Sequence, residues 1–235
     1  MRSRLQGGVM QMTFDELPQL MTLMTGDEKH STSATSTLDV LWVLYSDVLR
    51  LDPANPDDPD RDRFYLSKGH GPMAYYAVLA ARGFLTPNEL ASFGSYHSPL
   101  GNHPDRTLVR GADIGSGSLG HGLALAAGTA VALRIQKRRA RVFVLIGDAE
   151  LDEGSNMEAI QFAARSNLGN LTAVVIDNDS AGLGWPGGIA SRLAVEEWST
   201  SDVDGRDHDA LREDFRTDHT DRPHVMVAHV EKKES

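Results

Sequence analysis

The segment between residues 142 and 180 constrains the fold more than any other part of the chain. Its apolar run Val142–Ile146 is short and rich in β-branched residues, which is typical of a buried parallel strand. An acidic loop follows, and the next apolar residues recur at helical spacing: Ala159, Ile160, Phe162, Ala163 and Ala164. Leu171–Ile176 then has the character of a second strand. The segment therefore predicts one βαβ unit and an α/β fold.

Polar residues follow both predicted strands. Asp148 comes after the first strand and Asn178 after the second. Because a right-handed crossover joins parallel strands, both side chains are expected at the same carboxyl edge of the sheet, where open α/β sheets bind ligands. With the backbone carbonyl of Ser180 they would present three hard oxygen ligands. Such a set suits Mg²⁺ or Ca²⁺ and leaves coordination positions for water and diphosphate oxygens.

Other interpretations of this segment need to be weighed. Gly147-Asp148 could simply turn the chain after a strand, as such pairs often do in α/β proteins. An EF-hand is a poor alternative, because Glu153 occupies the position of its glycine and Ala159 that of its final glutamate. Spacing alone therefore leaves metal binding and a plain turn as competing interpretations.

Composition excludes several classes of function. A length of 235 residues favours one domain, which we expect over residues 28–235 after an N-terminal extension and helix in residues 1–27. The net charge of −10 argues against a nucleic-acid partner. The absence of cysteine excludes disulfides and agrees with a reducing cytoplasm. No apolar run approaches the roughly 18 residues of a membrane span. We therefore expect a cytoplasmic protein without a membrane partner.

Further elements are expected elsewhere in the chain. Helices are predicted after a Thr13–Glu16 capping box and in the apolar stretches Leu38–Leu49, Met73–Ala81, Leu123–Ile135 and Ala210–Phe215. An edge element is expected within Val195–Asp204, and a last strand at His224–Val230. Three segments are expected to lie outside regular structure: a loop at residues 31–37, an exposed connection at Asp52–Asp62, and a solvated basic run at residues 137–141.

Three polar loops lie between these elements. Residues 66–71 (LSKGHG) precede a predicted helix, whose N-terminal backbone donors favour an anion. Residues 101–104 (GNHP) lie in a turn-rich section, and residues 115–122 (GSGSLGHG) lead into another helix. Each loop is a weak signal by itself, because a histidine in a turn is more often structural than catalytic. Together with the acidic strand end they predict one binding site.

Taken in order, these motifs resemble the transketolase family. The resemblance rests on residues 60–70 (DRDRFYLSKGH), 101–104, 117–122, and Gly147-Asp148 through Asn178. It spans roughly residues 28–230 and concerns the diphosphate-binding domain alone. It implies a three-layer αβα thiamine-diphosphate-binding fold with a mostly parallel sheet. It also implies thiamine diphosphate and Mg²⁺ (or Ca²⁺) as cofactors, and a partner chain that carries the pyrimidine-binding domain, in an α2β2 heterotetramer.

The resemblance also implies roles for individual residues. The metal ligands would be Asp148, Asn178 and the Ser180 carbonyl. The cofactor would contact nine residues: His70, Gly117, Ser118, Leu119, Gly147, Asp148, Ala149, Glu150 and Asn178. Catalytic roles would fall to His30, His70, His103 and Glu153. The histidines would contact substrate oxygens and the reacting end of the cofactor. Glu153 and Glu158 would join a carboxylate network between two active sites.

The implied activity is transfer of a two-carbon ketol unit by one subunit of a split enzyme. The alternatives are a subunit of an enzyme that decarboxylates a 2-oxo acid, and a catalytically silent binding subunit; the substrate would be a small ketose or 2-oxo acid. Several positions depart from the family pattern, including His30-Ser31-Thr32 in place of Gly-His-Pro-Gly and a shortened section after Asn178. Three departures are single residues. Ala149 replaces the second glycine of Gly-Asp-Gly, His121 replaces a frequent glutamine, and Arg206 replaces a histidine. Ala149 is compatible with cofactor binding only if its φ is negative.

Overall fold

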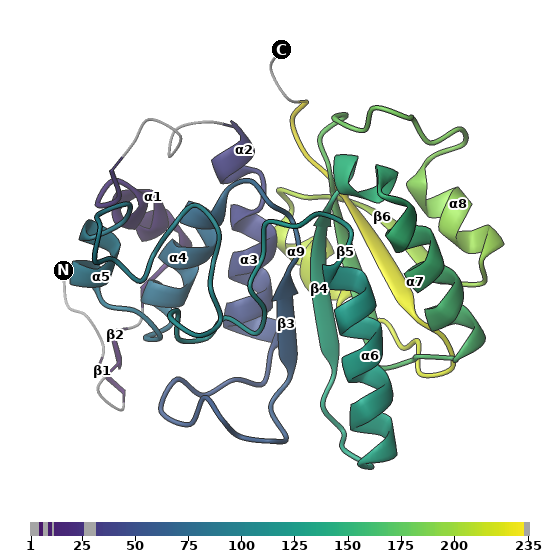
Figure 1. The fold of residues 1–235 in the computed structure, drawn as a ribbon, viewed down its shortest axis with the longest axis horizontal. Coiled ribbons are helices and arrows are strands. Elements are labelled where there is room, and N and C mark those ends of the chain that lie inside the picture. The colour runs from purple at the N-terminus through teal and green to yellow at the C-terminus, as the bar shows by residue number, and fades with distance from the viewer. Residues whose placement is uncertain (1–4, 7–8, 11, 26–31, 233–235) are drawn as a thin grey trace.

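A five-stranded parallel sheet forms the centre of the molecule (Figure 1). We describe it from a computed structural model that covers residues 5–6, 9–10, 12–25 and 32–232. In spatial order the strands are β3 (Arg63–Leu66), β4 (Val142–Gly147), β5 (Leu171–Asp177), β7 (His224–His229) and β6 (Ser199–Asp204). A short antiparallel pair, β1 (Leu5–Gln6) and β2 (Val9–Met10), lies apart from this sheet. The predicted α/β fold is confirmed.

Both faces of the sheet are buried, which explains the uninterrupted apolar runs of its strands. Every residue of β4 is buried. Because successive side chains of a strand point to opposite faces, Phe143 and Leu145 enter one core while Val144 and Ile146 enter the other. The sheet is therefore the middle layer of three.

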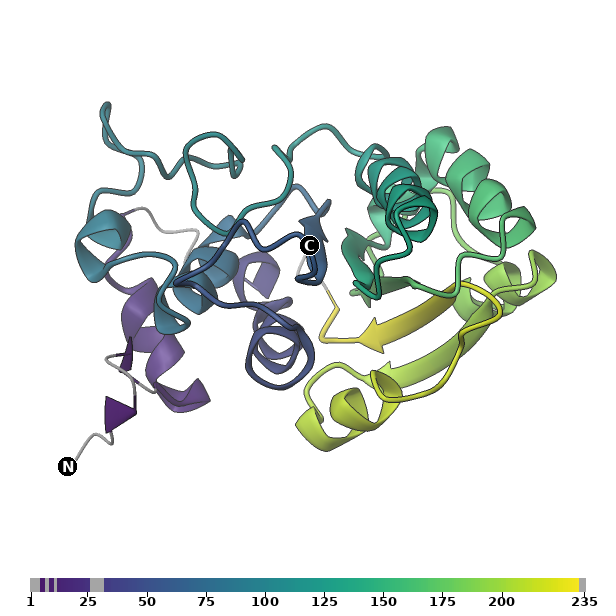
Figure 2. The same cartoon turned by 90° about the horizontal axis from the view of Figure 1, so that it is seen from below.

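Helices cover the two faces in separate groups. On one face lie α3 (Leu38–Val43), its π-helical continuation η3 (Leu44–Val48), α4 (Pro72–Ala81) and α9 (His208–Asp214). On the other lie α6 (Gly122–Ile135), α7 (Gly154–Arg165) and α8 (Ile189–Val195). Figure 2 shows α6 and α7 above the sheet and α9 below it. Within the described residues, no helix is long and apolar enough to cross a membrane.

Short helices extend the first core away from the sheet. These are η1 (Phe14–Glu16), α1 (Leu17–Met21), α2 (Thr32–Thr35) and α5 (Pro87–Ala91). The predicted Thr13–Glu16 capping box is present. The loop prediction for residues 31–37 is wrong within its described part, because α2 forms there and Ala34, Ser36 and Thr37 are buried. The small polar residues of this stretch carry no apolar period, and tertiary packing decides its structure.

The C-terminal strands agree with the sequence prediction except for the residue at which β6 begins. The last strand, β7, forms as predicted and lies between β5 and β6, so β6 is an edge strand as expected. The start predicted for this edge element was too early, because Val195 still belongs to α8. Several elements besides α2 were not predicted, among them β1, β2, β3, α5 and α8. These are short segments, and the polar residues in and around them hide any clear apolar period.

The connection before β3 contains a buried anion, which corrects the expectation of a wholly exposed loop. Asp62 has 0% exposure and accepts hydrogen bonds from the guanidinium groups of Arg50 and Arg141 at 2.7 and 2.6 Å. Burial alone would raise the pKa of Asp62, but these hydrogen bonds and those from backbone N–H groups hold it below its usual range. The basic run is likewise not simply solvated, since Arg138 pairs with Asp60 at 2.8 Å.

Candidate functional site

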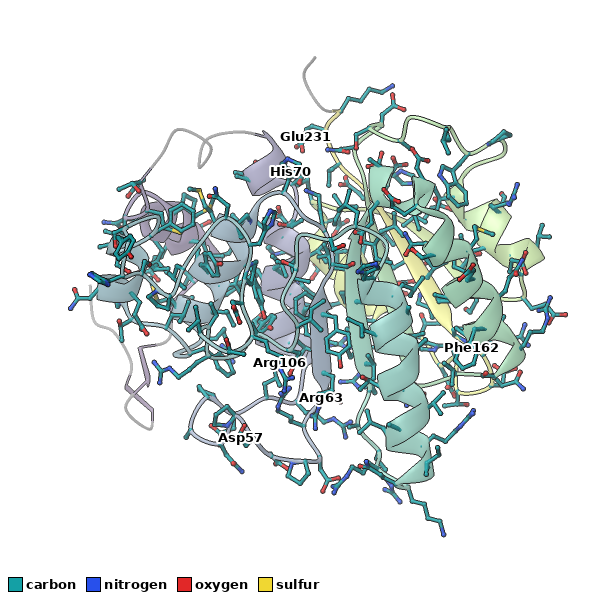
Figure 3. All side chains as sticks on the ribbon, in the orientation of Figure 1. Asp57, Arg63, His70, Arg106, Phe162 and Glu231 are labelled. Carbon is teal, nitrogen blue, oxygen red and sulfur yellow. The ribbon has the colours of Figure 1, made fainter. Side chains whose placement is uncertain are left out.

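A cavity of about 170 Å³ lies at the carboxyl ends of β4 and β5. The two strand ends are neighbours, because the backbone N–H of Asp148 donates to the carbonyl of Ile176 at 3.0 Å. The cavity is lined by Lys68, Gly69, His70, Leu119, Gly147, Asp148, Ala149, Glu150, Asn178 and Ser180. Segments from four parts of the chain therefore meet there. The predicted loops at residues 66–71 and 115–122 both contribute to the lining, whereas residues 101–104 do not. His70 lies at the upper end of the molecule in Figure 3, where the strands end.

The carboxylate of Asp148 anchors the loop that follows β5. Asp148 is 1% exposed. Its Oδ2 accepts hydrogen bonds from the backbone N–H groups of Ser180 and Ala181 at 2.5 and 3.1 Å, and its Oδ1 accepts one from the Ser180 hydroxyl at 2.6 Å. These bonds hold Ser180 beside Asp148 across the two strand ends. The acid and the loop that follows the amide thus lie together, as the βαβ unit predicted.

Asn178 provides an oxygen that the protein leaves without a partner. Its side chain is 5% exposed, and within the described residues no hydrogen bond reaches its buried Oδ1. A buried acceptor without a partner costs about 1–3 kcal/mol, so this oxygen requires an explanation such as a bound ion or water. An amide oxygen next to a carboxylate is a hard donor set. The residues present therefore fit a divalent cation such as Mg²⁺.

Groups of three or more histidine or carboxylate side chains arranged to hold a metal do not occur among the described residues. A metal at this cavity would consequently need the Asn178 amide, a backbone carbonyl and oxygens of the bound ligand to complete its shell. Mg²⁺ commonly binds in this way, through one or two carboxylates together with phosphate oxygens.

Glu150 joins three of the loops that frame the cavity. It is 2% exposed, and its Oε1 accepts hydrogen bonds from the Ser67 hydroxyl at 2.5 Å and from the Gly120 N–H at 3.0 Å. The Gly147 N–H lies 3.4 Å from Oε2. Burial raises the pKa of this carboxyl, although the hydrogen bonds oppose the shift. The carboxylate therefore fixes the relative positions of the loops at residues 67, 120 and 147.

His103 packs against the glycine-rich loop. Gly117 has φ +113°, and a Cβ at this position would lie 2.8 Å from Cγ of His103. Any larger residue would therefore clash with the imidazole, besides being strained at this φ. A Cβ on Gly69 would lie 4.0 Å from Cε1 of the same ring. The exposed His103 thus borders the loop that carries His70.

The other predicted residues lie at varying distances from this centre. Glu153 is exposed and adjoins Gly120, because a Cβ there would lie 2.7 Å from Cβ of Glu153. Glu158 is exposed on α7, and Ser118 is exposed in the glycine-rich loop. His30 lies outside the described residues.

The sequence assigned no role to Lys68, which lines the cavity, or to its chain neighbour Ser67, which bonds to the cavity residue Glu150. Ser67 bridges two loops, because its hydroxyl donates to Glu150 and accepts from the Gly122 N–H at 3.1 Å. Lys68 is 9% exposed, lines the cavity, and donates to the His70 carbonyl at 3.1 Å. Their place between a strand and a helix N-terminus was the signal that could have identified them.

Two of the departures from the family pattern are accommodated by the structure. Ala149 begins the 3-10 helix η4 (Ala149–Asp152) and is not among the described non-glycine residues with positive φ. Its methyl group therefore causes no backbone strain. Arg206 forms ion pairs with Asp39 and Glu231, both at 2.5 Å.

Comparison with known proteins supports the resemblance to the transketolase family. A family model described as "Transketolase, thiamine diphosphate binding domain" matches residues 22–228. The chain is 56% identical over 219 residues to "Ferredoxin fas2" of Rhodococcoides fascians, covering 93% of this chain and 72% of that protein. It is 33% identical over 205 residues to an apulose-4-phosphate transketolase subunit of Phocaeicola vulgatus, covering 84% and 73%.

Solved structures show the same fold. The transketolase from Leishmania mexicana aligns with a TM-score of 0.78 at 24% identity, over 93% of this chain and 37% of that chain. This chain thus spans little more than a third of that transketolase. The match at residues 22–228 shows that the chain belongs to the transketolase family, as a transketolase-like subunit that carries the thiamine-diphosphate-binding domain.

Proposed function

We propose that the chain is the N-terminal subunit of a split, cytoplasmic transketolase-like enzyme that transfers a two-carbon ketol unit. It would supply the metal- and diphosphate-binding half of the active site. The observation that carries this proposal is the buried Asn178 Oδ1 without a partner, in the same cavity as the Asp148 carboxylate. The "6-deoxy-6-sulfo-D-fructose transketolase subunit SqwG" of a Clostridium strain is 34% identical over 188 residues, and its name as one subunit of a transketolase supports the proposal.

The cavity residues divide into metal and cofactor contacts. Asp148, Asn178 and the Ser180 carbonyl would hold Mg²⁺ (or Ca²⁺). The loops at Gly147–Glu150, at His70 and at Gly117–Leu119 would hold thiamine diphosphate, with the buried Lys68 offsetting some of its negative charge. When bound, this cofactor supplies an electron sink that stabilises a carbanion next to a former carbonyl.

The exposed histidines have the chemistry that a ketose substrate requires. His70 lines the cavity and His103 borders the loop that carries it. An imidazole can donate to substrate oxygens and can also move a proton. His30 would take a similar role by its place in the sequence. Glu153 and Glu158 would join a carboxylate network between two active sites of the assembled enzyme.

A partner chain completes this proposal. Because the relatives from Phocaeicola vulgatus and the Clostridium strain are named as subunits of transketolases, we propose that a second chain supplies the pyrimidine-binding domain, in an α2β2 assembly. The lone chain should then bind thiamine diphosphate weakly and show no turnover.

Calorimetry of thiamine diphosphate with Mg²⁺, with and without the partner, tests the proposed site. Asp148→Ala and Asn178→Ala should abolish Mg²⁺-dependent binding, whereas Asp57→Asn, on a distant loop, should leave it unchanged. Without metal, Asn178→Ala should cost less than about 1 kcal/mol of stability, because the lost oxygen has no partner. Strong destabilisation by this variant without any effect on binding would show a purely structural asparagine.

Activity of the two-subunit complex separates the ketol transferase from its rivals. With a ketose phosphate or hydroxypyruvate as donor, we expect two-carbon transfer to an aldehyde. Decarboxylation of pyruvate with onward acyl transfer would instead identify an enzyme that acts on 2-oxo acids. Full activity of a complex that contains Asp148→Ala would identify a catalytically silent subunit.

A further inference from the structure

A second cavity, of about 470 Å³, lies at the other end of the strands, across the sheet from the cofactor cavity. It is lined by Arg139, Arg141, Phe143, Gly169, Asn170, Thr172, Phe215, Arg216, Thr217, Asp218, His219 and Thr220. Arg141 and Asn170 directly precede β4 and β5, so this cavity is at the amino ends of these strands. β4 has six residues, and about 3.3 Å per residue places the two cavities roughly 20 Å apart.

This cavity is a local concentration of positive charge in a chain whose net charge is −10. Three guanidinium groups line it, against one carboxylate, that of Asp218. Arg141 shares the buried Asp62 with Arg50, so that one anion faces two cations. Neither Arg139 nor Arg216 forms an ion pair with any residue in the described ranges. The cavity therefore has positive charge that the surrounding side chains do not neutralise.

Aromatic rings and hydroxyl groups complete the lining. Phe143 and Phe215 pack edge to face with ring centroids 6.0 Å apart, and the Arg141 guanidinium lies 5.0 Å above the Phe143 ring. His219 stacks on His224, and its Nε2 lies 3.2 Å from the Thr172 hydroxyl. Burial, followed by the neighbouring His224, lowers the pKa of His219. The cavity thus combines a cationic rim with an apolar floor and neutral polar groups.

We propose that this cavity binds a phosphorylated small molecule that also carries a flat, apolar group. Guanidinium groups match phosphate oxygens in geometry and charge, and this favours a phosphate at the rim. The side chains of Phe143 and Phe215 suit contact with a flat ring of the ligand rather than with a sugar. The proposed site is separate from the cofactor cavity and does not depend on the ketol-transfer proposal.

Calorimetry and thermal unfolding of the full chain test this site, in metal-free buffer of low ionic strength. The probes are inorganic phosphate, pyrophosphate and ADP, and we expect ADP to bind most tightly because it carries a ring. Removing a charge-assisted contact should weaken binding by about tenfold or more, so Arg139→Gln combined with Arg216→Gln should raise the Kd for ADP by at least that factor. Arg165→Gln, which removes an exposed charge on α7, and Asp148→Ala, in the cofactor cavity, should not change it.

Four outcomes would overturn the proposal. One is the absence of saturable binding of any probe at concentrations of about 1 mM. A Kd of that size corresponds to a binding free energy of roughly −4 kcal/mol. A second is equal loss of binding in Arg165→Gln, which would show attraction to net charge rather than to this cavity. A third is loss of binding in Asp148→Ala alone, which would place the probe in the cofactor cavity. Equal affinities for phosphate and ADP would remove the role of the aromatic floor.

Discussion

Replacing Glu150 tests whether one buried carboxylate holds the active-site loops together. Glu150→Ala leaves the Ser67 hydroxyl and the Gly120 N–H, which donate at 2.5 and 3.0 Å, without their acceptor. Each buried donor left without a partner costs about 1–3 kcal/mol. The contact from the Gly147 N–H, at 3.4 Å, is too long to add much. We therefore expect a loss of about 3 kcal/mol in the free energy of unfolding, together with weaker thiamine diphosphate binding.

Glu150→Gln separates the hydrogen bonds from the charge. Its amide oxygen can still accept from Ser67 and Gly120, so this variant should lose only about 1 kcal/mol. Urea denaturation of both variants gives the comparison, and calorimetry gives the cofactor affinity. Glu158→Ala, an exposed carboxylate on α7, is the control and should stay within about 0.5 kcal/mol of the parent chain. The reasoning is refuted if Glu150→Ala costs less than about 1 kcal/mol, or if the glutamine variant is equally damaging.

Two further predictions concern stability. The depressed pKa of Asp62 stabilises the fold above its unfolded pKa of 3.8, and this stabilisation is lost as the pH falls through the lower folded value. Asp62→Asn should therefore lose about 3 kcal/mol at neutral pH and show a flatter acid dependence below about pH 4, whereas Asp57→Asn retains the steeper one. Gly122→Ala would place a Cβ in steric overlap with the Ser67 side chain and should destabilise by about 1–3 kcal/mol. In Gly128→Ala the added Cβ meets nothing within 4 Å, so this variant should raise the free energy of unfolding by up to about 1 kcal/mol. Equal changes in the free energy of unfolding for the two glycine variants, measured by urea denaturation, would contradict this reasoning.

The sequence by itself determined the βαβ unit and its ligand-binding edge. Val142–Ile146 is apolar throughout because a central parallel strand is buried on both faces, and a run of this kind is visible without coordinates. The right-handed crossover then placed the polar residues after β4 and β5 at one edge. The order of the motifs identified the family and its cofactor.

Only the tertiary structure decided how the loops meet. The Glu150 hydrogen bonds join residues 83 and 30 positions apart, and no local pattern encodes such pairings. The same is true of Asp62, which sits in an aspartate-rich, apparently exposed stretch but is buried because Arg50 and Arg141 converge on it. The position of β7 inside the sheet and the negative φ of Ala149 likewise depend on packing. Periodicity reports which face of an element is buried, but only packing fixes the neighbour that each face meets.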